Sequence, residues 1–176
     1  MRDVVLFIAM SLDGYIADKN GGVGWLSGQG DADEPMDSYG TFIKDVDTVV
    51  MGWKTYHQVV TELSPGQWVY EGLKTYVITH RNLTSEEGIV FTVQDPCELI
   101  KNLRKEDGRR IWICGGADLI RQLEGANLID EYQLSVIPVI LGSGIRLFSP
   151  ASEEKNLKLL RSREYGGIAE LVYRKR

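Results

Sequence analysis

Two short segments of this chain combine glycine with groups that bind anions. One is Gly52-Trp53-Lys54-Thr55 and the other is Gly115-Gly116-Ala117, and each directly follows a run of mainly apolar residues. Such a junction is typical of a buried strand that turns into a helix, where unpaired N–H groups and a partial positive charge attract phosphate. The glycines would let a ligand lie against the backbone. An ordinary strand-to-helix turn is the alternative for each segment taken alone.

Two more segments follow apolar runs in the same way. Thr79-His80-Arg81 offers a hydroxyl and two basic groups to a phosphate monoester, although a solvated loop is the commoner structure for such a triplet. Residues 11–17 and 21–26 form a long glycine-rich stretch, which either covers a bound ligand or is a plain flexible loop. Ligands of open α/β sheets bind beyond the carboxyl ends of the strands. We therefore expect the two glycine segments and the Thr79 segment to contribute to one site.

Strand-like and helix-like segments alternate along most of the chain, and these elements must position the candidate groups. Continuous apolar runs predict strands that are covered on both faces, at residues 4–10, 48–51, 75–79, 89–91 and 111–114. Helical spacing of apolar residues predicts helices over 36–46, 56–63 and 96–103, and from near Gly116 to Gly125. Asp95 and Pro96 are typical of a helix start, because aspartate accepts bonds from free N–H groups there.

The pattern changes after Gly125. Residues 130–139 and 157–163 are expected to form strands, and Gly166-Gly167 indicates a tight turn into a last strand over 169–173. The fold class predicted from this order is α/β: a three-layer fold with a mainly parallel central sheet and an antiparallel C-terminal edge hairpin. We expect residues 1–176 to form a single domain.

Length, charge and composition exclude several classes of protein. The chain has 176 residues and a net charge of −5, which argues against nucleic-acid binding. Its apolar runs are all far shorter than the ~20 residues that cross a bilayer, so we expect no membrane partner and a cytoplasmic location. Two cysteines without a CxxC pair and two histidines without ligand spacing predict no metal site.

Taken in order, these segments resemble the dihydrofolate reductase superfamily over nearly the whole chain. Residues 50–56 are similar to the family's M-G-R-x-T-[WF] segment, which holds the cofactor pyrophosphate. Residues 113–117 are similar to its I-G-G-[AG] segment, whose glycines are joined by a cis peptide beside the nicotinamide. Residues 11–17 and 138–148 resemble the S-L-D-G-x-I-A and P-x-x-x-G-x-G-x-x-L-F segments of the reductase domain of bifunctional riboflavin-biosynthesis enzymes. The chain looks like a stand-alone member of that group.

The resemblance implies NADPH as cofactor and gives a role to each segment. The cofactor-binding residues that it implies are Gly52, Trp53, Lys54, Thr55, Thr79, His80, Arg81, Gly115, Gly116 and Ala117. Trp53 stands where the family has an arginine, so the grip on the adenosine 2′-phosphate falls to His80 and Arg81, while Trp53 either stacks on the adenine or packs. The candidate substrate-binding residues are Ser11, Asp13 and Cys114.

Asp37 is the candidate catalytic residue. It is the nearest match to the carboxylate that dihydrofolate reductases carry at the start of their first helix, where it binds the pterin and assists protonation. Residues 27–35 look like an insertion before it. A charge stabilised by the helix dipole is the alternative role for Asp37.

The resemblance implies an NADPH-dependent reductase that transfers a hydride to a small pterin- or pyrimidine-like heterocycle. A narrower alternative is the 5-amino-6-(5-phosphoribosylamino)uracil reductase of riboflavin biosynthesis, for which Arg146 would contribute a phosphate contact. A non-catalytic nucleotide-binding protein is the alternative from another class, although a sensor needs neither the glycine-rich loop nor Asp37. Related domains are commonly homodimers, so the expected partners are a small-molecule substrate and a second copy of the chain.

Overall fold

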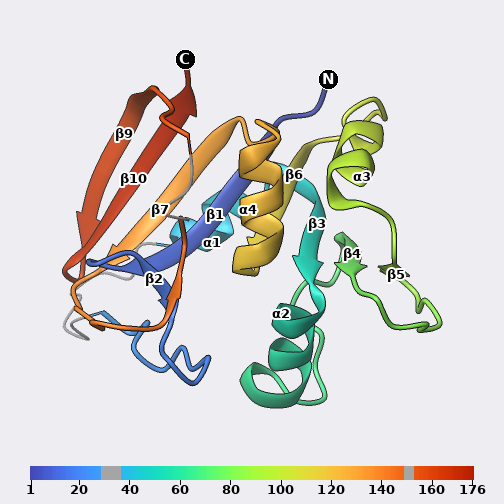
Figure 1. The fold of residues 1–176 in the computed structure, drawn as a ribbon, viewed down its shortest axis with the longest axis horizontal. Helices are drawn as coiled ribbons and strands as arrows, with labels where there is room; N and C mark the ends of the chain where they lie inside the picture. The colour runs from blue at the N-terminus through green and yellow to red at the C-terminus, as the bar shows by residue number, and fades with distance from the viewer. Residues whose placement is uncertain (29–36, 149–152) are drawn as a thin grey trace.

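An eight-stranded sheet forms the centre of the fold, seen in a computed structural model (Figure 1). The structure describes residues 1–28, 37–148 and 153–176, so most of the predicted insertion over 27–35 lies outside the described residues. The strands of the large sheet are β1 (Val4–Ser11), β3 (Val46–Gly52), β4 (Lys74–Ile78), β5 (Ile89–Thr92), β6 (Arg110–Gly115), β7 (Glu131–Ile137), β9 (Leu157–Tyr165) and β10 (Ile168–Lys175). Two short strands, β2 (Tyr15–Ala17) and β8 (Ile145–Arg146), form a separate antiparallel pair.

The strand order confirms the predicted fold class. The large sheet runs β5-β4-β3-β6-β1-β7-β10-β9. Every pairing from β5 to β7 is parallel, and the two pairings that involve β10 are antiparallel. Gly166 and Gly167 connect β9 to β10 with φ values of 51° and 74°, as the tight turn predicted there requires. The edge hairpin therefore lies at the C-terminal side of a mainly parallel sheet.

Helices cover both faces of the sheet and complete three layers. Side chains alternate between the faces of a strand, so Leu6 of β1 packs with α3 (Pro96–Leu103) and α4 (Ala117–Gly125), whereas Val5 packs with α1 (Ser38–Ile43). Figure 1 shows α4 in front of the sheet and α1 behind it. None of the helices in the described part of the chain is long and apolar enough to cross a membrane.

Two predicted helices differ from those in the structure. The helix predicted over 36–46 is limited to α1, because Val46 already pairs with Arg110 in the ladder between β3 and β6. Pairing within the sheet thus prevails over the helical spacing of the apolar residues. The second helix begins at Trp53 as α2 (Trp53–Gln58) and continues as a π-helical turn, η1 (Val59–Leu63).

The start predicted for α3 is confirmed in detail. Asp95 is the N-cap of this helix, and its carboxylate accepts a hydrogen bond from the Glu98 amide at 3.0 Å. Pro96 occupies the first helical turn, where a missing N–H costs nothing. Leu99, Ile100 and Leu103 are buried, as their helical spacing predicts.

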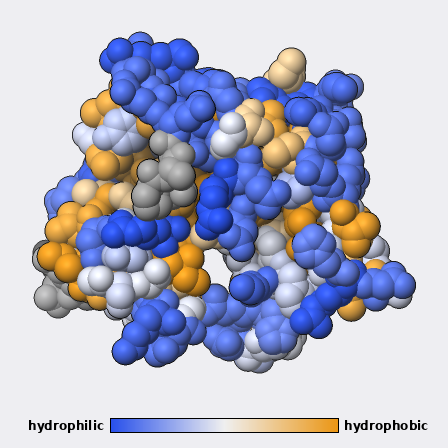
Figure 2. All heavy atoms as spheres, viewed as in Figure 1, coloured by the Kyte–Doolittle hydropathy of each residue, from blue (hydrophilic) through white to orange (hydrophobic). Residues whose placement is uncertain are grey.

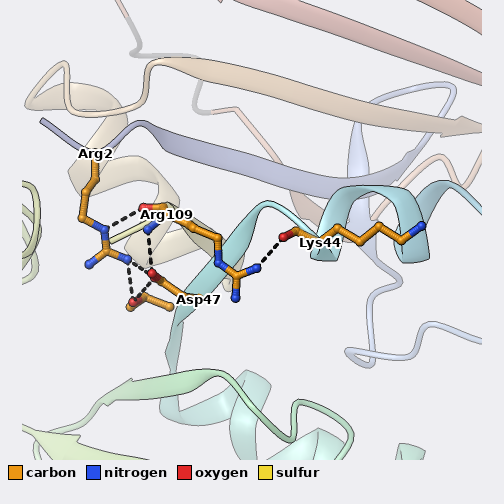
Figure 3. A network of polar contacts seen from close by, with 5 residues as sticks. Arg2, Lys44, Asp47 and Arg109 are labelled. Atoms are coloured by element: carbon orange, nitrogen blue, oxygen red, sulfur yellow. Dashed lines mark hydrogen bonds and ion pairs between the residues drawn. The ribbon is translucent and has the colours of Figure 1, made fainter. Parts of the chain in front are cut away.

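A polar network closes the amino ends of β1, β3 and β6 (Figure 3). The buried Arg2 side chain donates to the Arg109 carbonyl at 2.7 Å, to Thr48 Oγ1 at 2.7 Å and to Asp47. Asp47 also accepts from the Arg109 amide at 2.6 Å, and the Arg109 guanidinium donates to the Lys44 carbonyl at 2.5 Å. Burial opposes ionisation of Asp47, but these hydrogen bonds and the charge of Arg2 outweigh it and lower the pKa of Asp47.

The Asp47→Ala variant is expected to be about 3 kcal/mol less stable than the parent, near the lower end of the range for breaking a buried ion pair. Arg2 would lose its carboxylate partner while keeping the Arg109 carbonyl and the Thr48 hydroxyl. Urea unfolding measures the difference. The control is Asp118→Ala, which breaks the exposed ion pair between Asp118 and Arg121 and is expected to cost less than about 1 kcal/mol. Equal costs for the two variants would contradict the role given to Asp47.

Candidate functional site

The segments that were expected to bind a ligand begin side by side at the carboxyl ends of the parallel strands. Met51 of β3 pairs with Gly115 of β6, and Gly52 pairs with Ile78 of β4. The two glycine segments and the Thr79 segment therefore leave the sheet at one edge. This is the edge at which ligands of open α/β sheets bind.

Gly52, Gly115 and Gly116 form a bare backbone surface at this edge, called here the glycine surface. Gly115 has a φ of +134°, which side-chain-bearing residues rarely adopt, and the peptide bond between Gly115 and Gly116 is cis, as the resemblance implied. A Cβ on Gly116 would lie 3.3 Å from Thr55 Oγ1, and one on Gly52 would lie 3.6 Å from the Gly116 nitrogen. Side chains here would fill the space in which a flat ligand could lie against the backbone.

Two helices begin at the glycine surface without a capping side chain. Gly52 is the N-cap of α2 and Gly116 is the N-cap of α4, and neither forms a side-chain cap hydrogen bond. The first N–H groups of α4, from Ala117 onward, therefore point out of the helix without a side-chain acceptor at the cap. Lys54 is exposed in the first turn of α2. A ligand with phosphate groups suits this combination of free donors and positive charge.

The Thr79 segment joins this group through Trp53. The buried Thr79 hydroxyl accepts a hydrogen bond from the Arg81 amide at 3.0 Å, while the His80 and Arg81 side chains are exposed. The Arg81 guanidinium lies over the Trp53 ring, 4.8 Å from its centre. Trp53 therefore packs against a cation of the Thr79 segment.

Ser11 and Asp13, the predicted substrate contacts, are engaged within the protein. The fully buried Ser11 hydroxyl donates to Asp13 at 2.6 Å and accepts from the Tyr15 amide at 2.9 Å. Asp13 also accepts from the amides of Leu141 and Gly142, at 3.1 and 2.7 Å. The hydrogen bond from Ser11, helped by these amides, lowers the pKa of Asp13 to about 2. The pair thus anchors the end of β1 to residues 141–142, and contact of either residue with substrate stays a prediction.

Cys114 and Tyr70 form a pair of neutral donors beside the glycine surface. Cys114 directly precedes Gly115, and its thiol lies 3.7 Å from the Tyr70 hydroxyl on the α1 side of the sheet. Burial raises the pKa of the Cys114 thiol to about 11 and also raises the pKa of Tyr70. Both groups therefore stay protonated at neutral pH. The substrate contact predicted for Cys114 would be that of a thiol and not of a thiolate.

Asp37 stands at the start of α1 with an exposed side chain. One oxygen of its carboxylate accepts a hydrogen bond from the Gly40 amide at 2.6 Å, so Asp37 is the N-cap of the helix. The other oxygen forms no hydrogen bond within the described part of the chain. Capping and contact with substrate are therefore compatible, and the catalytic role stays a prediction.

The face that carries α4 is hollowed where these elements meet. Figure 2 shows an opening below α4, between the start of α2 and the loop that carries β2, with a largely hydrophilic rim. The free N-terminus of α4 faces this opening. Within residues 1–28, 37–148 and 153–176, no group of three His, Cys, Asp or Glu side chains is placed to hold a metal ion.

A separate cavity of about 370 Å³ lies on the α1 face, away from the glycine surface. Three of its charged side chains already have partners, because Arg110 pairs with Glu131 at 2.5 Å and Arg161 pairs with the fully buried Glu170 at 3.1 Å. Asp45 is the one charged lining residue without an ion pair among the residues that the structure describes, so the cavity offers a ligand a single free carboxylate. The glycine surface, with its bare backbone, its uncapped helix N-termini and the exposed Lys54, is the better candidate for a ligand site.

The order of these segments along one fold is matched by a known protein family. The model of the RibD C-terminal domain matches residues 2–169. The chain belongs to the RibD C-terminal domain family. Two proteins of Bacillus subtilis (strain 168) are similar to it along their length: YwjB is 36% identical over 98% of this chain and 97% of its own, and YyaP is 31% identical over 98% and 94%.

Solved structures of three other proteins show the same fold. A putative riboflavin biosynthesis protein from Shewanella sp. PV-4 superposes with a TM-score of 0.84 over 99% of both chains, at 24% identity. A pyrimidine reductase-like protein from Corynebacterium diphtheriae gives 0.69 over 99% of this chain and 92% of its own, at 13% identity. The deaminase/reductase of Thermotoga maritima gives 0.71 at 17% identity, and this chain covers 57% of it. This is the dihydrofolate reductase-like fold.

In this RibD C-terminal domain, residues 11–17 pack against residues 138–148, the two segments that resemble riboflavin-biosynthesis reductases. This contact was not predicted from the sequence. β2 of the first segment pairs with β8 of the second, and the Arg146 guanidinium lies 4.8 Å from the centre of the Tyr15 ring. Gly144 has a φ of +144° and lies so close to the Ala17 carbonyl that a Cβ would stand 2.2 Å from its oxygen. The glycines of the second segment were the available signal, because they mark where another backbone approaches closely.

Proposed function

We propose that this protein is an NADPH-dependent reductase that transfers a hydride to a small pterin- or pyrimidine-like heterocycle. The observation that carries the proposal is the glycine surface at the carboxyl ends of β3 and β6, which opens to the hollow below α4. Membership of the RibD C-terminal domain family supports an oxidoreductase. The names of the Thermotoga and Corynebacterium proteins support a pyrimidine-like substrate.

The residues of this site fit a nicotinamide dinucleotide. A planar ring fits against Gly115 and Gly116, where a Cβ would intrude, and the free donors of α4 with Lys54 suit a pyrophosphate. Thr79, His80 and Arg81 offer a hydroxyl and cationic donors to a phosphate monoester. NADPH would supply the hydride, while the protein supplies orientation and electrostatics.

The α1 side of the sheet is the expected place of the substrate. Asp37, at the start of α1, has a free carboxylate oxygen that would bind the heterocycle and assist protonation. The Cys114 thiol and the Tyr70 hydroxyl are neutral donors beside Gly115. Ser11 and Asp13 hold the loop after β1 in place around this space.

A narrower function, reduction of a phosphorylated ribosylamino-pyrimidine, is favoured by one further observation. Arg146 is exposed, is held over the Tyr15 ring, and has no carboxylate partner among the residues that the structure describes. Such a cation is free to bind a substrate phosphate. Comparison of turnover with phosphorylated and dephosphorylated pyrimidines, in the parent protein and in Arg146→Ala, tests this function.

NADPH is expected to bind about 10- to 100-fold more tightly than NADH, because a hydrogen bond to a charged group contributes about 1.5–3 kcal/mol. Isothermal titration calorimetry with both cofactors measures the two affinities. The Arg81→Ala variant is expected to lose most of the preference and to keep its affinity for NADH. An unchanged preference in that variant would remove Arg81 from the cofactor site.

Turnover separates an enzyme from a non-catalytic binder. NADPH oxidation in the presence of pterins and pyrimidines, followed by the loss of NADPH absorbance, is the expected result for a reductase. A protein that binds NADPH tightly and oxidises none of it with any of these compounds would favour the nucleotide-binding alternative.

A further inference from the structure

We propose that Trp53 is a positioning residue for cofactor specificity, because it holds the Arg81 guanidinium where it binds the phosphate monoester of the dinucleotide. This inference rests on the proposed function, in which Arg81 contacts the 2′-phosphate of NADPH. It adds a residue that acts through Arg81 and that contacts no phosphate itself.

The geometry places Arg81 between two fixed points. Its backbone amide donates to the Thr79 hydroxyl at 3.0 Å, and Thr79 itself is buried at the end of β4. Its guanidinium lies 4.8 Å from the centre of the Trp53 ring. Both the backbone and the guanidinium of this exposed arginine therefore have fixed contacts. Fixing an arginine costs rotamer entropy, and the contact with Trp53 offsets part of that cost before a ligand binds.

The Trp53 ring is itself fixed by aromatic neighbours. The ring centres of Tyr56 and Phe91 lie 5.6 and 6.3 Å from that of Trp53, and the rings of Tyr56 and Phe91 meet edge to face at 5.1 Å. Trp53 also follows Gly52 directly, so it is tied to the glycine surface. Arg81 thus packs on an aromatic cluster at the carboxyl end of β3, the sheet edge at which the cofactor is proposed to bind.

The charges around Arg81 leave it free to bind an anion. No carboxylate within the described ranges forms an ion pair with Arg81. Two exposed basic residues are instead its neighbours: His80 precedes Arg81 in the chain, and Lys54 follows Trp53. A guanidinium that lies over a ring keeps its in-plane N–H groups available for oxygen acceptors. An arginine at position 53 would repel Arg81, whereas tryptophan attracts it.

A double-mutant cycle tests the proposal. NADPH and NADH affinities are measured for the parent, Trp53→Leu, Arg81→Ala and the double variant. Calorimetry is used because removal of Trp53 alters the tryptophan fluorescence. Trp53→Leu is expected to weaken NADPH about two- to fivefold, the range that an exposed cation–π contact supplies, and to leave NADH unchanged. In the Arg81→Ala background the same substitution is expected to have no effect on the preference.

Two further variants keep the result interpretable. Trp53→Phe retains a ring and is expected to restore most of the NADPH preference, which also covers the case in which Trp53→Leu fails to fold. Lys74→Ala is the matched control, because Lys74 Nζ likewise lies over an aromatic ring, 5.1 Å from the centre of Tyr76, but at the amino end of β4 and so at the opposite edge of the sheet. It is expected to leave the preference for NADPH unchanged.

Different failures point to different errors. If the parent prefers NADPH but Trp53→Leu weakens both cofactors equally, or has the same effect with and without Arg81, the positioning role is overturned and the proposed function stands. If the parent protein binds neither cofactor, the proposed function fails, and the role of Trp53 fails with it.

Discussion

An Asp37→Asn variant is expected to bind NADPH as tightly as the parent protein and to lose about 10²–10⁴-fold in turnover, the usual contribution of a general acid or base. The substitution is nearly isosteric and removes the negative charge that would bind and help to protonate the heterocycle. The helix should survive, because asparagine caps a helix N-terminus as well as aspartate does. Turnover, NADPH affinity and the thermal unfolding midpoint are measured together.

The chain contains a matched control for Asp37. Asp95 caps α3 in the same manner, with its carboxylate bonded to the Glu98 amide, but α3 is not part of the site. Asp95→Asn is expected to retain full turnover and an unchanged unfolding midpoint. If Asp37→Asn also retained full turnover, Asp37 would be only a helix cap. If the unfolding midpoint fell in both Asp37→Asn and Asp95→Asn, the loss of turnover in Asp37→Asn would be explained by the weakened helix cap and not by the missing charge.

Replacing Gly144 by alanine is expected to destabilise the protein by about 2–6 kcal/mol. A Cβ would stand 2.2 Å from the Ala17 carbonyl oxygen, so β8 would have to move away from β2. Overpacking typically costs about 1–3 kcal/mol, and the φ of +144° adds backbone strain of about 1–3 kcal/mol in a residue with a side chain. Chemical denaturation measures the loss, and an unfolded variant would agree with the upper end.

Gly142→Ala separates the two causes. Gly142 also has a positive φ, +72°, but a Cβ there would meet nothing within 4 Å. Only the backbone cost remains, so the loss should be about 1 kcal/mol, the lower end of the range for a strained residue. Equal losses in the two variants would show that the approach of Gly144 to Ala17 contributes nothing to stability.

Local patterns in the sequence were sufficient for the order of the longer helices and strands and for the sheet edge at which the candidate segments meet. The apolar runs that became β1, β3, β4 and β6 are buried on both faces, which is the condition under which a strand is hydrophobic throughout. Asp95 marked a helix start because its capping partner lies only three residues away. The convergence of Gly52, Gly115 and Thr79 followed from topology, since parallel neighbours end at the same edge.

Contacts between distant segments could not be predicted in this way. The pair of β2 and β8 contains too few residues for a periodic pattern, and it joins Tyr15 to Arg146 across more than a hundred residues of chain. The packing of Arg81 on Trp53 is likewise a tertiary contact with no local signal. The end of α1 was misplaced because Val46 belongs to a ladder whose other strand is β6. The expected homodimer stays a prediction, which light scattering of the purified protein would check.

The position of the two chain ends decides how the protein can be attached to a surface. Met1 is 95% exposed next to the buried Arg2, and both ends lie at the amino side of the sheet, across the molecule from α2 (Figure 1). A biotin or a fused carrier domain at either end would therefore be attached on the side opposite the proposed cofactor site. A protein immobilised on a biosensor through such a tag would present the glycine surface to the flowing solution, and we expect the affinities measured there to equal those in free solution.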